Sequence, residues 1–145
     1  MNKIYVREEV CMGCHLCEVF CRLEHSHSKD LIKAFKQELP SPLSRCSVEI
    51  RKPVSLSLRC QNCEEAPCLY YCLTGALHRD TSSGIVVVDE NKCIGCWTCL
   101  LACPFGAIRR DTLQKRIVKC DLCGGKEMPV CVSNCPNEAL VYYHE

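Results

Sequence analysis

The cysteine run over residues 93–104 constrains the fold of this chain most. It reads C-I-G-C-W-T-C-L-L-A-C-P, which is a C-x2-C-x2-C-x3-C-P spacing. Three thiolates so close together can wrap one face of a four-iron, four-sulfur cube, and the spacing is typical of such ligation. Gly95 allows the loop to turn tightly and brings backbone N–H groups toward the sulfur atoms. The last cysteine, which Pro104 follows, is expected to open a helix and to ligate a neighbouring cluster.

The remaining cysteines repeat this run. Of the 17 cysteines, all but Cys46 fall into four groups, and each group ends in C-x3-C. The second and fourth groups carry inner spacers of four and seven residues. In chain order the groups are Cys11, Cys14, Cys17 and Cys21; Cys60, Cys63, Cys68 and Cys72; Cys93, Cys96, Cys99 and Cys103; and Cys120, Cys123, Cys131 and Cys135.

The repeat extends beyond the cysteines. Three groups continue into similar tails, C-L-T-G-A-L, C-P-F-G-A-I and C-P-N-E-A-L. We interpret each unit as strand, cysteine loop, one or two turns of helix and second strand, so the predicted fold class is α+β with short elements around iron–sulfur clusters. Each group follows a short segment of strand-forming residues, namely 4–6, 54–58, 85–88 and 116–118.

The first unit departs from this pattern after its last cysteine. Residues 29–39 place Leu31, Ile32, Phe35 and Leu39 on one helical face, which predicts a helix that the following prolines end. Residues 41–53 are interpreted as an irregular connector. The apolar helix face could serve as a docking patch or could cover the outer clusters.

Composition excludes several other classes of protein. The chain start has no apolar signal core, so a secreted disulfide scaffold is not favoured and a cytoplasmic location is expected. No apolar run approaches the roughly 20 residues of a membrane span. The formal net charge of +1 counts the thiols as neutral, and four thiolate-ligated clusters of about −2 each would make the holoprotein acidic. Since no basic stripe carries interleaved aromatic residues, nucleic-acid binding is not expected.

With these groups and spacers, residues 6–141 resemble a known family. They look like the four-cluster, ferredoxin-like electron-transfer subunits of the dimethyl-sulfoxide-reductase beta-subunit type. Relatives of that family serve formate dehydrogenases, hydrogenases, carbon monoxide dehydrogenase and tungsten aldehyde oxidoreductases. Many carry a long C-terminal extension, and the short stretch after Cys135 is expected to mark a minimal version without one.

The resemblance implies four [4Fe–4S] clusters and a crossed ligand pattern, in which the last cysteine of each group ligates the cluster of a partner group. The first group pairs with the fourth, and the second with the third. We call the implied ligand sets quartets. The first quartet is Cys11, Cys14, Cys17 and Cys135; the second is Cys120, Cys123, Cys131 and Cys21; the third is Cys60, Cys63, Cys68 and Cys103; and the fourth is Cys93, Cys96, Cys99 and Cys72.

This pairing implies two nested two-cluster modules. The outer module comprises residues 1–51 with 113–145, and the inner module comprises residues 52–112. A C-x3-C step spans at most about 14 Å, so the paired clusters must lie close together. The implied function is the relay of single electrons between a catalytic subunit and another redox subunit or carrier. The catalytic subunit would be of the aldehyde oxidoreductase, carbon monoxide dehydrogenase, formate dehydrogenase or hydrogenase type. A flavin-containing, NAD(P)H-linked subunit is one candidate for the other redox partner.

Three alternatives remain open from the residues alone. The chain could be a freely diffusing polyferredoxin shuttle, since its ligands would be the same. It could be a zinc scaffold, although three cysteines in seven residues overfill a tetrahedral site. Independent catalysis is not expected, because the sequence has no glycine-rich nucleotide loop and no paired catalytic carboxylates. Cys46 is interpreted as a buried or partner-facing thiol, with a redox or ligand role as the alternative.

Overall fold

The computed structural model describes residues 2–143, which form short strands and short helices in alternation. The strands are β1 (Lys3–Val6), β2 (Cys46–Arg51), β3 (Val54–Arg59), β4 (Leu77–Arg79), β5 (Val86–Val88), β6 (Arg109–Asp111), β7 (Arg116–Val118) and β8 (Leu140–Tyr143). The helices are α1 (Leu16–Glu24), α2 (Leu31–Lys36), α3 (Pro67–Tyr70), α4 (Thr98–Ala102), α5 (Leu122–Gly125) and α6 (Val130–Ser133). The predicted mixture of short α and β elements is therefore confirmed.

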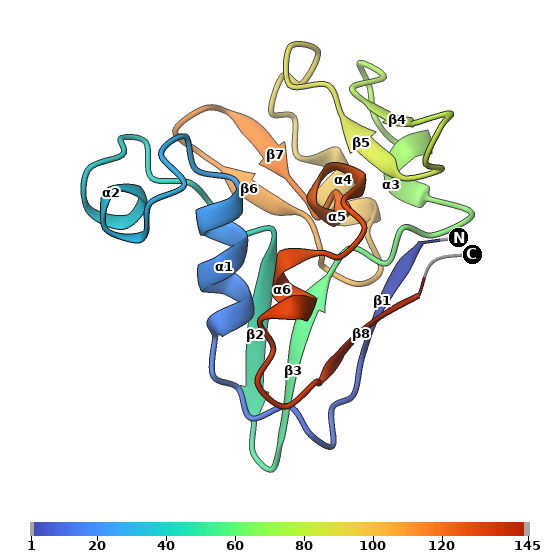
Figure 1. The fold of residues 1–145 in the computed structure, drawn as a ribbon. Coiled ribbons are helices and arrows are strands. Elements are labelled where there is room, and N and C mark those ends of the chain that lie inside the picture. The colour runs from blue at the N-terminus through green and yellow to red at the C-terminus, as the bar shows by residue number, and fades with distance from the viewer. Residues whose placement is uncertain (1, 144–145) are drawn as a thin grey trace.

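The strands pair into two-stranded antiparallel sheets. β1 pairs with β8, so segments from the two ends of the described chain lie side by side (Figure 1). Tyr5 of β1 meets Tyr143 of β8 edge to face, with ring centroids 5.2 Å apart. The other sheets are local hairpins, β2–β3, β4–β5 and β6–β7. All four predicted strand segments form strands, because each alternates or clusters apolar residues, most of which are β-branched.

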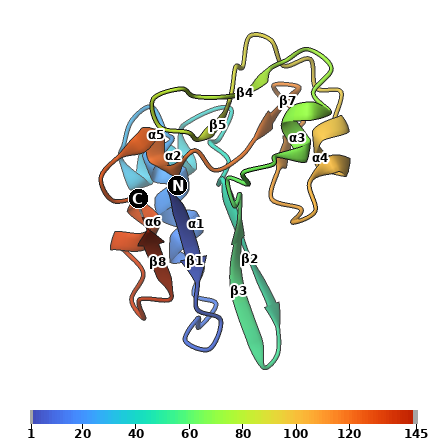
Figure 2. The same ribbon diagram turned by 90° about the vertical axis from the view of Figure 1, so that its right-hand side faces the viewer.

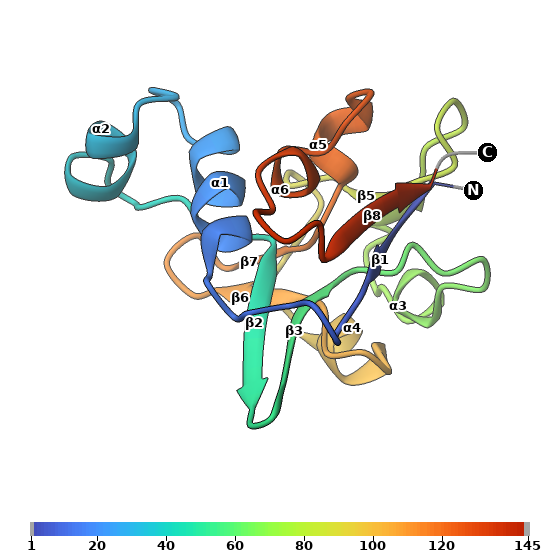
Figure 3. The same ribbon diagram turned by 60° about the horizontal axis from the view of Figure 1, so that its bottom comes forward.

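Four of the six helices in the described chain form two pairs on opposite sides of the β2–β3 hairpin. α1 packs against α6, and α3 packs against α4. Figure 2 shows the first pair with β1 and β8 on one side, and the second pair with β4 on the other. Figure 3 shows α2 projecting from the far side of α1. No helix in residues 2–143 is long and apolar enough to cross a membrane.

Each helix pair has its own hydrophobic cluster, and cysteines belong to both. One cluster is built on Leu77, Val86, Ile108 and Ile117, with buried Cys68 and Cys99 among its members. The other is built on Ile4, Ile85, Leu122 and Leu140, with buried Cys120 and Cys131.

Two local predictions were wrong, and one predicted helix is shorter than expected. The connector predicted over residues 41–53 contains strand β2, because Val48 and Ile50 alternate with polar residues and pair with β3, while the prolines lie outside the strand. The helix predicted over residues 29–39 is confined to α2, which Asp30 caps by accepting a hydrogen bond from the Lys33 N–H at 2.9 Å.

The prediction that Cys103 opens a helix was wrong. It caps the C-terminal end of α4, and Pro104 prevents the helix from continuing.

Candidate iron–sulfur centres

Three hollows in the structure are each lined by thiols from two distant cysteine groups. The first hollow lies beside α1 and the start of β8. Met12, His15 and Pro136 complete part of its wall. Its cysteines are Cys11, Cys14, Cys17 and Cys135, the members of the first quartet. The structure therefore brings Cys135 to the three cysteines of the first group, more than 100 residues away in sequence.

The second hollow lies between α1 and α6. Its cysteines are Cys21, Cys120, Cys123 and Cys131, the second quartet, with Cys46 as a fifth. The third hollow is lined by the third quartet, Cys60, Cys63, Cys68 and Cys103. Each of the three hollows contains a cysteine that comes from a partner group.

The fourth quartet is also brought together. Cys72, Cys93 and Cys99 belong to the same hydrophobic cluster. The thiol of Cys72 lies within electrostatic range of both Cys96 and Cys99. Cys72 comes from the second group and the other three from the third, so this set repeats the crossed arrangement.

The helices explain how one C-x3-C step serves two quartets. Cys17 and Cys21 both lie on α1, one turn apart, and side chains at this spacing have Cβ atoms about 5–6 Å apart. Cys17 faces the first hollow and Cys21 the second. On α6, Cys131 lines the second hollow, and Cys135 just beyond the helix lines the first. Because α1 packs against α6, the two helices exchange thiols across their contact.

The loops of the first and third groups share an unusual backbone conformation. Gly13 and Gly95 both have φ near +68°, and His15 and Trp97, two residues later, have φ of 62° and 64°. This left-handed conformation is costly for any residue except glycine. Its recurrence at matching positions shows that the two loops have the same shape as well as the same spacing.

Buried thiols need a metal to ionise at neutral pH. Burial raises the pKa of Cys120 to about 12 and that of Cys99 to about 11. Both are therefore protonated unless a metal takes the place of the proton, which is the usual behaviour of thiolate ligands. Within residues 2–143, no three cysteine, histidine or acidic side chains converge closely enough to hold a single metal ion. The thiols converge on the hollows in sets of four from two distant cysteine groups, and four thiolates are the donor set of a [4Fe–4S] cluster.

Polar groups point at several of these sulfur atoms. The backbone N–H of Arg45 donates to Cys21 Sγ at 3.2 Å, and Ser57 Oγ lies 3.2 Å from Cys17 Sγ. Arg59 Nη1 donates to Cys131 Sγ at 3.0 Å. Hydrogen bonds to ligating sulfur are one means by which proteins tune cluster potentials. These residues were missed in the sequence because they lie in or beside the segment interpreted as a connector; the alternation of Ser55, Ser57 and Arg59 on one strand face was the available signal.

Exposure differs between the quartets. Cys14 of the first quartet and Cys96 of the fourth are exposed. The second and third quartets contain no exposed cysteine, and all their members lie in the described part of the chain. The first and fourth quartets are therefore the ones that reach the surface.

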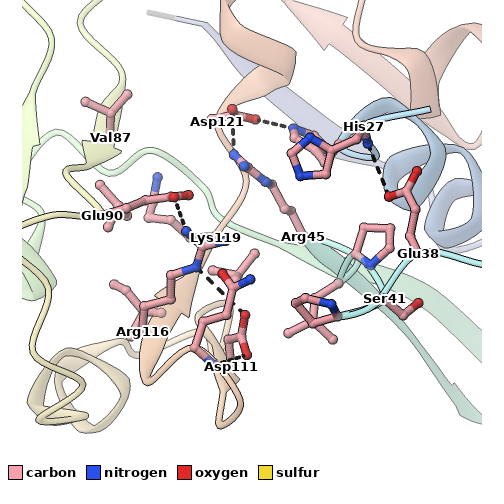
Figure 4. A pocket seen from close by; sticks show the side chains of 18 of the residues that line it. His27, Glu38, Ser41, Arg45, Val87, Glu90, Asp111, Arg116, Lys119 and Asp121 are labelled. Carbon is pink, nitrogen blue, oxygen red and sulfur yellow. Dashed lines mark hydrogen bonds and ion pairs between the residues drawn. The ribbon is translucent and has the colours of Figure 1, made fainter. Parts of the chain in front are cut away.

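A cleft of about 300 Å³ without cysteines lies beside the second hollow, between the segment around Arg45 and strands β5 and β7 (Figure 4). Several of its charged side chains pair with one another: Asp121 contacts Arg45 at 2.6 Å and His25 Nε2 at 3.2 Å, and Arg116 contacts Glu90. Although burial raises the pKa of Asp121, His25 and Arg45 lower it to about 2. His25 Nδ1 also donates to the Cys21 carbonyl at 2.8 Å, so this network holds α1 beside the second quartet.

Cys46 is buried in the second hollow, next to two cysteines of the first group. Contact with Cys17 lowers the pKa of the Cys46 thiol and contact with Cys21 raises it, and with burial the result is about 12. Its backbone is fixed by Ser44, whose Oγ donates to the Cys46 carbonyl at 2.7 Å. The interpretation of Cys46 as a buried thiol is thus confirmed as to its burial, and its role stays a prediction.

We expect Cys46→Ala to retain the iron content of the unsubstituted protein, since the crossed pattern assigns Cys46 to no quartet. The matched variant Cys21→Ala, in the same hollow, should lose about one quarter of the iron, because one ligand of one cluster is removed. Iron and acid-labile sulfide, measured anaerobically on purified variants, provide the check. An equal loss in both variants would identify Cys46 as a ligand.

The fold and the thiol-lined hollows define the class of the protein as an iron–sulfur protein. Comparison with known proteins then gives the family: residues 53–144 match the family model described as the 4Fe-4S dicluster domain, and the chain belongs to this family. The predicted resemblance to iron–sulfur electron-transfer proteins is confirmed.

Individual relatives carry corresponding names. The chain is 36% identical over 153 residues to an iron-sulfur protein of Rhodospirillum rubrum, a match that covers 94% of this chain and 79% of that protein. It is 35% identical over 150 residues to the thiosulfate reductase electron transfer subunit PhsB of Salmonella typhi, covering 93% and 71%. A chain of the active site complex BamBC of benzoyl coenzyme A reductase, in complex with zinc, matches 100% of this chain and 80% of its own length with a TM-score of 0.52. At 24% sequence identity this last likeness concerns the fold alone.

Proposed function

We propose that this chain relays single electrons through four [4Fe–4S] clusters, held by the four quartets, between a catalytic oxidoreductase subunit and a second redox subunit or carrier. The observation that carries the proposal is that three hollows are each lined by the thiols of one crossed quartet. Each cluster, when bound, gains or loses one electron without making a bond to a substrate.

The positions of the thiols relative to one another support an order of the quartets. Cys17 and Cys21 on α1 link the first quartet to the second. Cys120 lies within electrostatic range of Cys60, which links the second to the third, and Cys99 lies within range of Cys68, which links the fourth to the third. These three links support the order first, second, third, fourth. The exposed thiols belong to the two ends of this order, where partners would exchange electrons.

The nested modules are part of the proposal. The β1–β8 sheet and the α1–α6 contact join the two segments of the outer module, while β4–β5 and α3–α4 lie within the inner one. The expected boundaries at residues 51/52 and 112/113 coincide with the turns of the β2–β3 and β6–β7 hairpins. The terminal limits of the outer module, residues 1 and 144–145, lie outside the described residues.

The partner is proposed to be an oxidoreductase subunit, in line with the electron transfer subunit named among the relatives. Exposed apolar side chains surround the end of the order at the fourth quartet: Ile94 is 64% exposed and Leu101 is 90% exposed. Apolar side chains in such a position favour protein contact over solvent. We also propose a cytoplasmic location, because thiols that serve as ligands need a reducing compartment.

Anaerobic purification of the tagged full chain from its native source tests this proposal. We expect a catalytic oxidoreductase subunit to co-purify in stoichiometric amount, and Leu101→Lys to weaken that association. Leu39→Lys is the matched control, since Leu39 is equally exposed but lies beyond α2, away from the fourth quartet. A monomeric, iron-loaded chain without a partner would favour the freely diffusing polyferredoxin instead. If only Leu39→Lys weakened the association, the partner would dock at α2 and not at the fourth quartet.

A further inference from the structure

A fully buried arginine lies where the two modules meet. Arg59 is the last residue of β3 and directly precedes Cys60, and its side chain has no solvent exposure. Its guanidinium donates to Cys131 Sγ at 3.0 Å and to Ser57 Oγ, and its Nε has no partner within residues 2–143. No carboxylate of the described chain forms an ion pair with it.

Through Ser57 the same cation reaches a second quartet. Ser57 Oγ accepts from Arg59 and lies 3.2 Å from Cys17 Sγ. Arg59 thus contacts the second quartet directly, at Cys131, and the first quartet through one hydroxyl. Its position just before Cys60 places the third quartet next to it along the chain.

A second buried cation occupies the equivalent position of the fourth group. Lys119 directly precedes Cys120, as Arg59 precedes Cys60, and is only 2% exposed. Its Nζ donates to the carbonyl oxygens of Val86 and Cys120, the latter at 2.8 Å. Figure 4 shows Lys119 in the wall of the charged cleft, away from Asp121.

Each cation acts on the quartet of the other group. Arg59, from the second group, contacts the quartet that the fourth group leads. Lys119, from the fourth group, donates to the carbonyl oxygen of Val86, and Val86 lines the hollow of the third quartet, which the second group leads. Cys60 and Cys120, which follow the two cations, are themselves in electrostatic range. The two positive charges therefore flank the junction between the second and third quartets.

Burying a cation without a carboxylate is strongly unfavourable unless other negative charge compensates for it. Thiolate ligands and the clusters they hold would supply that charge at this junction. Each one-electron reduction adds one further negative charge, so a fixed cation stabilises the reduced form more than the oxidised form.

We infer that Arg59 and Lys119 set the reduction potentials at the centre of the electron path, Arg59 by stabilising the reduced form at the second quartet and Lys119 by stabilising it at the third. This inference rests on the proposed function. The two residues would thereby favour electron transfer between the modules. Similar reduction potentials on both sides of the junction mean that the transfer from one cluster to the next is not thermodynamically unfavourable.

Redox titration of the reconstituted full chain, with dithionite as reductant and EPR detection, tests the inference. We expect Arg59→Met to lower the equilibrium constant for reduction at the second quartet at least tenfold, which is 59 mV for a one-electron couple. Lys119→Met should have the same effect at the third quartet, and Arg59→Lys, which keeps the charge, a smaller one. Arg51→Met, on the exposed end of the same hairpin, is the matched control and should leave all potentials unchanged. Signals are assigned with Cys123→Ser for the second quartet and Cys63→Ser for the third.

Midpoints that stay unchanged in fully iron-loaded Arg59→Met and Lys119→Met would overturn the inference. If either methionine variant fails to hold iron, the charge-retaining variants Arg59→Lys and Lys119→Arg decide: loading with near-native midpoints supports a role of charge, and equal loss of iron assigns the residues to packing alone. The iron content of the unsubstituted chain is measured in parallel, so that a shortage of clusters counts against the proposed function and not against this inference.

Discussion

Removing the iron is expected to unfold this protein. The sheets of the described chain have two strands each, and an isolated pair of strands is marginally stable in water. The longest described helix, α1, has 9 residues, fewer than the 12–15 or so that an isolated helix needs. Structural metal sites can contribute about 10–16 kcal/mol in small peptides, which equals or exceeds the whole stability of a typical domain of about 5–15 kcal/mol. The clusters therefore decide whether the elements stay together.

The measurement is thermal unfolding followed by circular dichroism, before and after anaerobic oxidation with ferricyanide in the presence of a chelator. We expect the treated protein to lose its cooperative transition and to regain it after reconstitution with ferrous iron and sulfide. Regain of the transition is the control for chemical damage. A treated, iron-free chain that still unfolds cooperatively at the original temperature would contradict this expectation.

Gly95→Ala is expected to be among the most damaging single substitutions. A Cβ atom at Gly95 would lie 2.4 Å from the backbone oxygen of Lys115, in the β6–β7 turn. Backbone atoms in a tight turn cannot move aside as a side chain can. The left-handed φ of +68° costs any L-residue about 1–2 kcal/mol in addition.

Two other glycines separate these contributions. Gly75 has a φ of +65° and open space around its Cβ position, so Gly75→Ala measures the backbone cost alone. Gly13 has the same φ as Gly95, but the nearest neighbours of its Cβ would be side-chain atoms, Ile50 Cδ1 at 3.0 Å, Ile50 Cγ1 at 3.2 Å and Ser55 Cβ at 3.4 Å. We expect the loss of stability to rise in the order Gly75, Gly13, Gly95, with Gly95→Ala exceeding Gly75→Ala by about 2 kcal/mol or more, a typical overpacking penalty. Thermal midpoints of the iron-loaded proteins give this order, and equal effects at Gly75 and Gly95 would show that the overlap with Lys115 is relieved.

The cysteine spacing predicted the repeated units because each ligand loop imposes its own local geometry. The segments around Ile4, Val86 and Ile117 become strands for the same reason in each unit, since they enter a ligand loop and pack against it. The prediction of which four thiols meet at each site came from the family resemblance. Spacing alone leaves open which group supplies each fourth cysteine, because that depends on how α1 packs on α6 and α3 on α4.

The part that could not be predicted lies between the first and second groups. Prolines at both ends of residues 41–53 suggested an irregular segment, but they lie outside β2 and leave its alternation intact. Without that strand, neither the hairpin nor the burial of Arg59 could be foreseen. A buried arginine has no periodic signal in sequence, since its site is created by tertiary contact with Cys131 and Ser57.

We propose that sixteen thiols hold four clusters, and the number of iron atoms per chain tests this most directly. Anaerobic iron and acid-labile sulfide analysis of the fully reconstituted chain, together with its protein concentration by amino-acid analysis, gives the number of clusters. The account predicts about sixteen irons and sixteen sulfides per chain. A value near eight irons after full reconstitution would contradict it, because two of the four quartets would then hold no cluster.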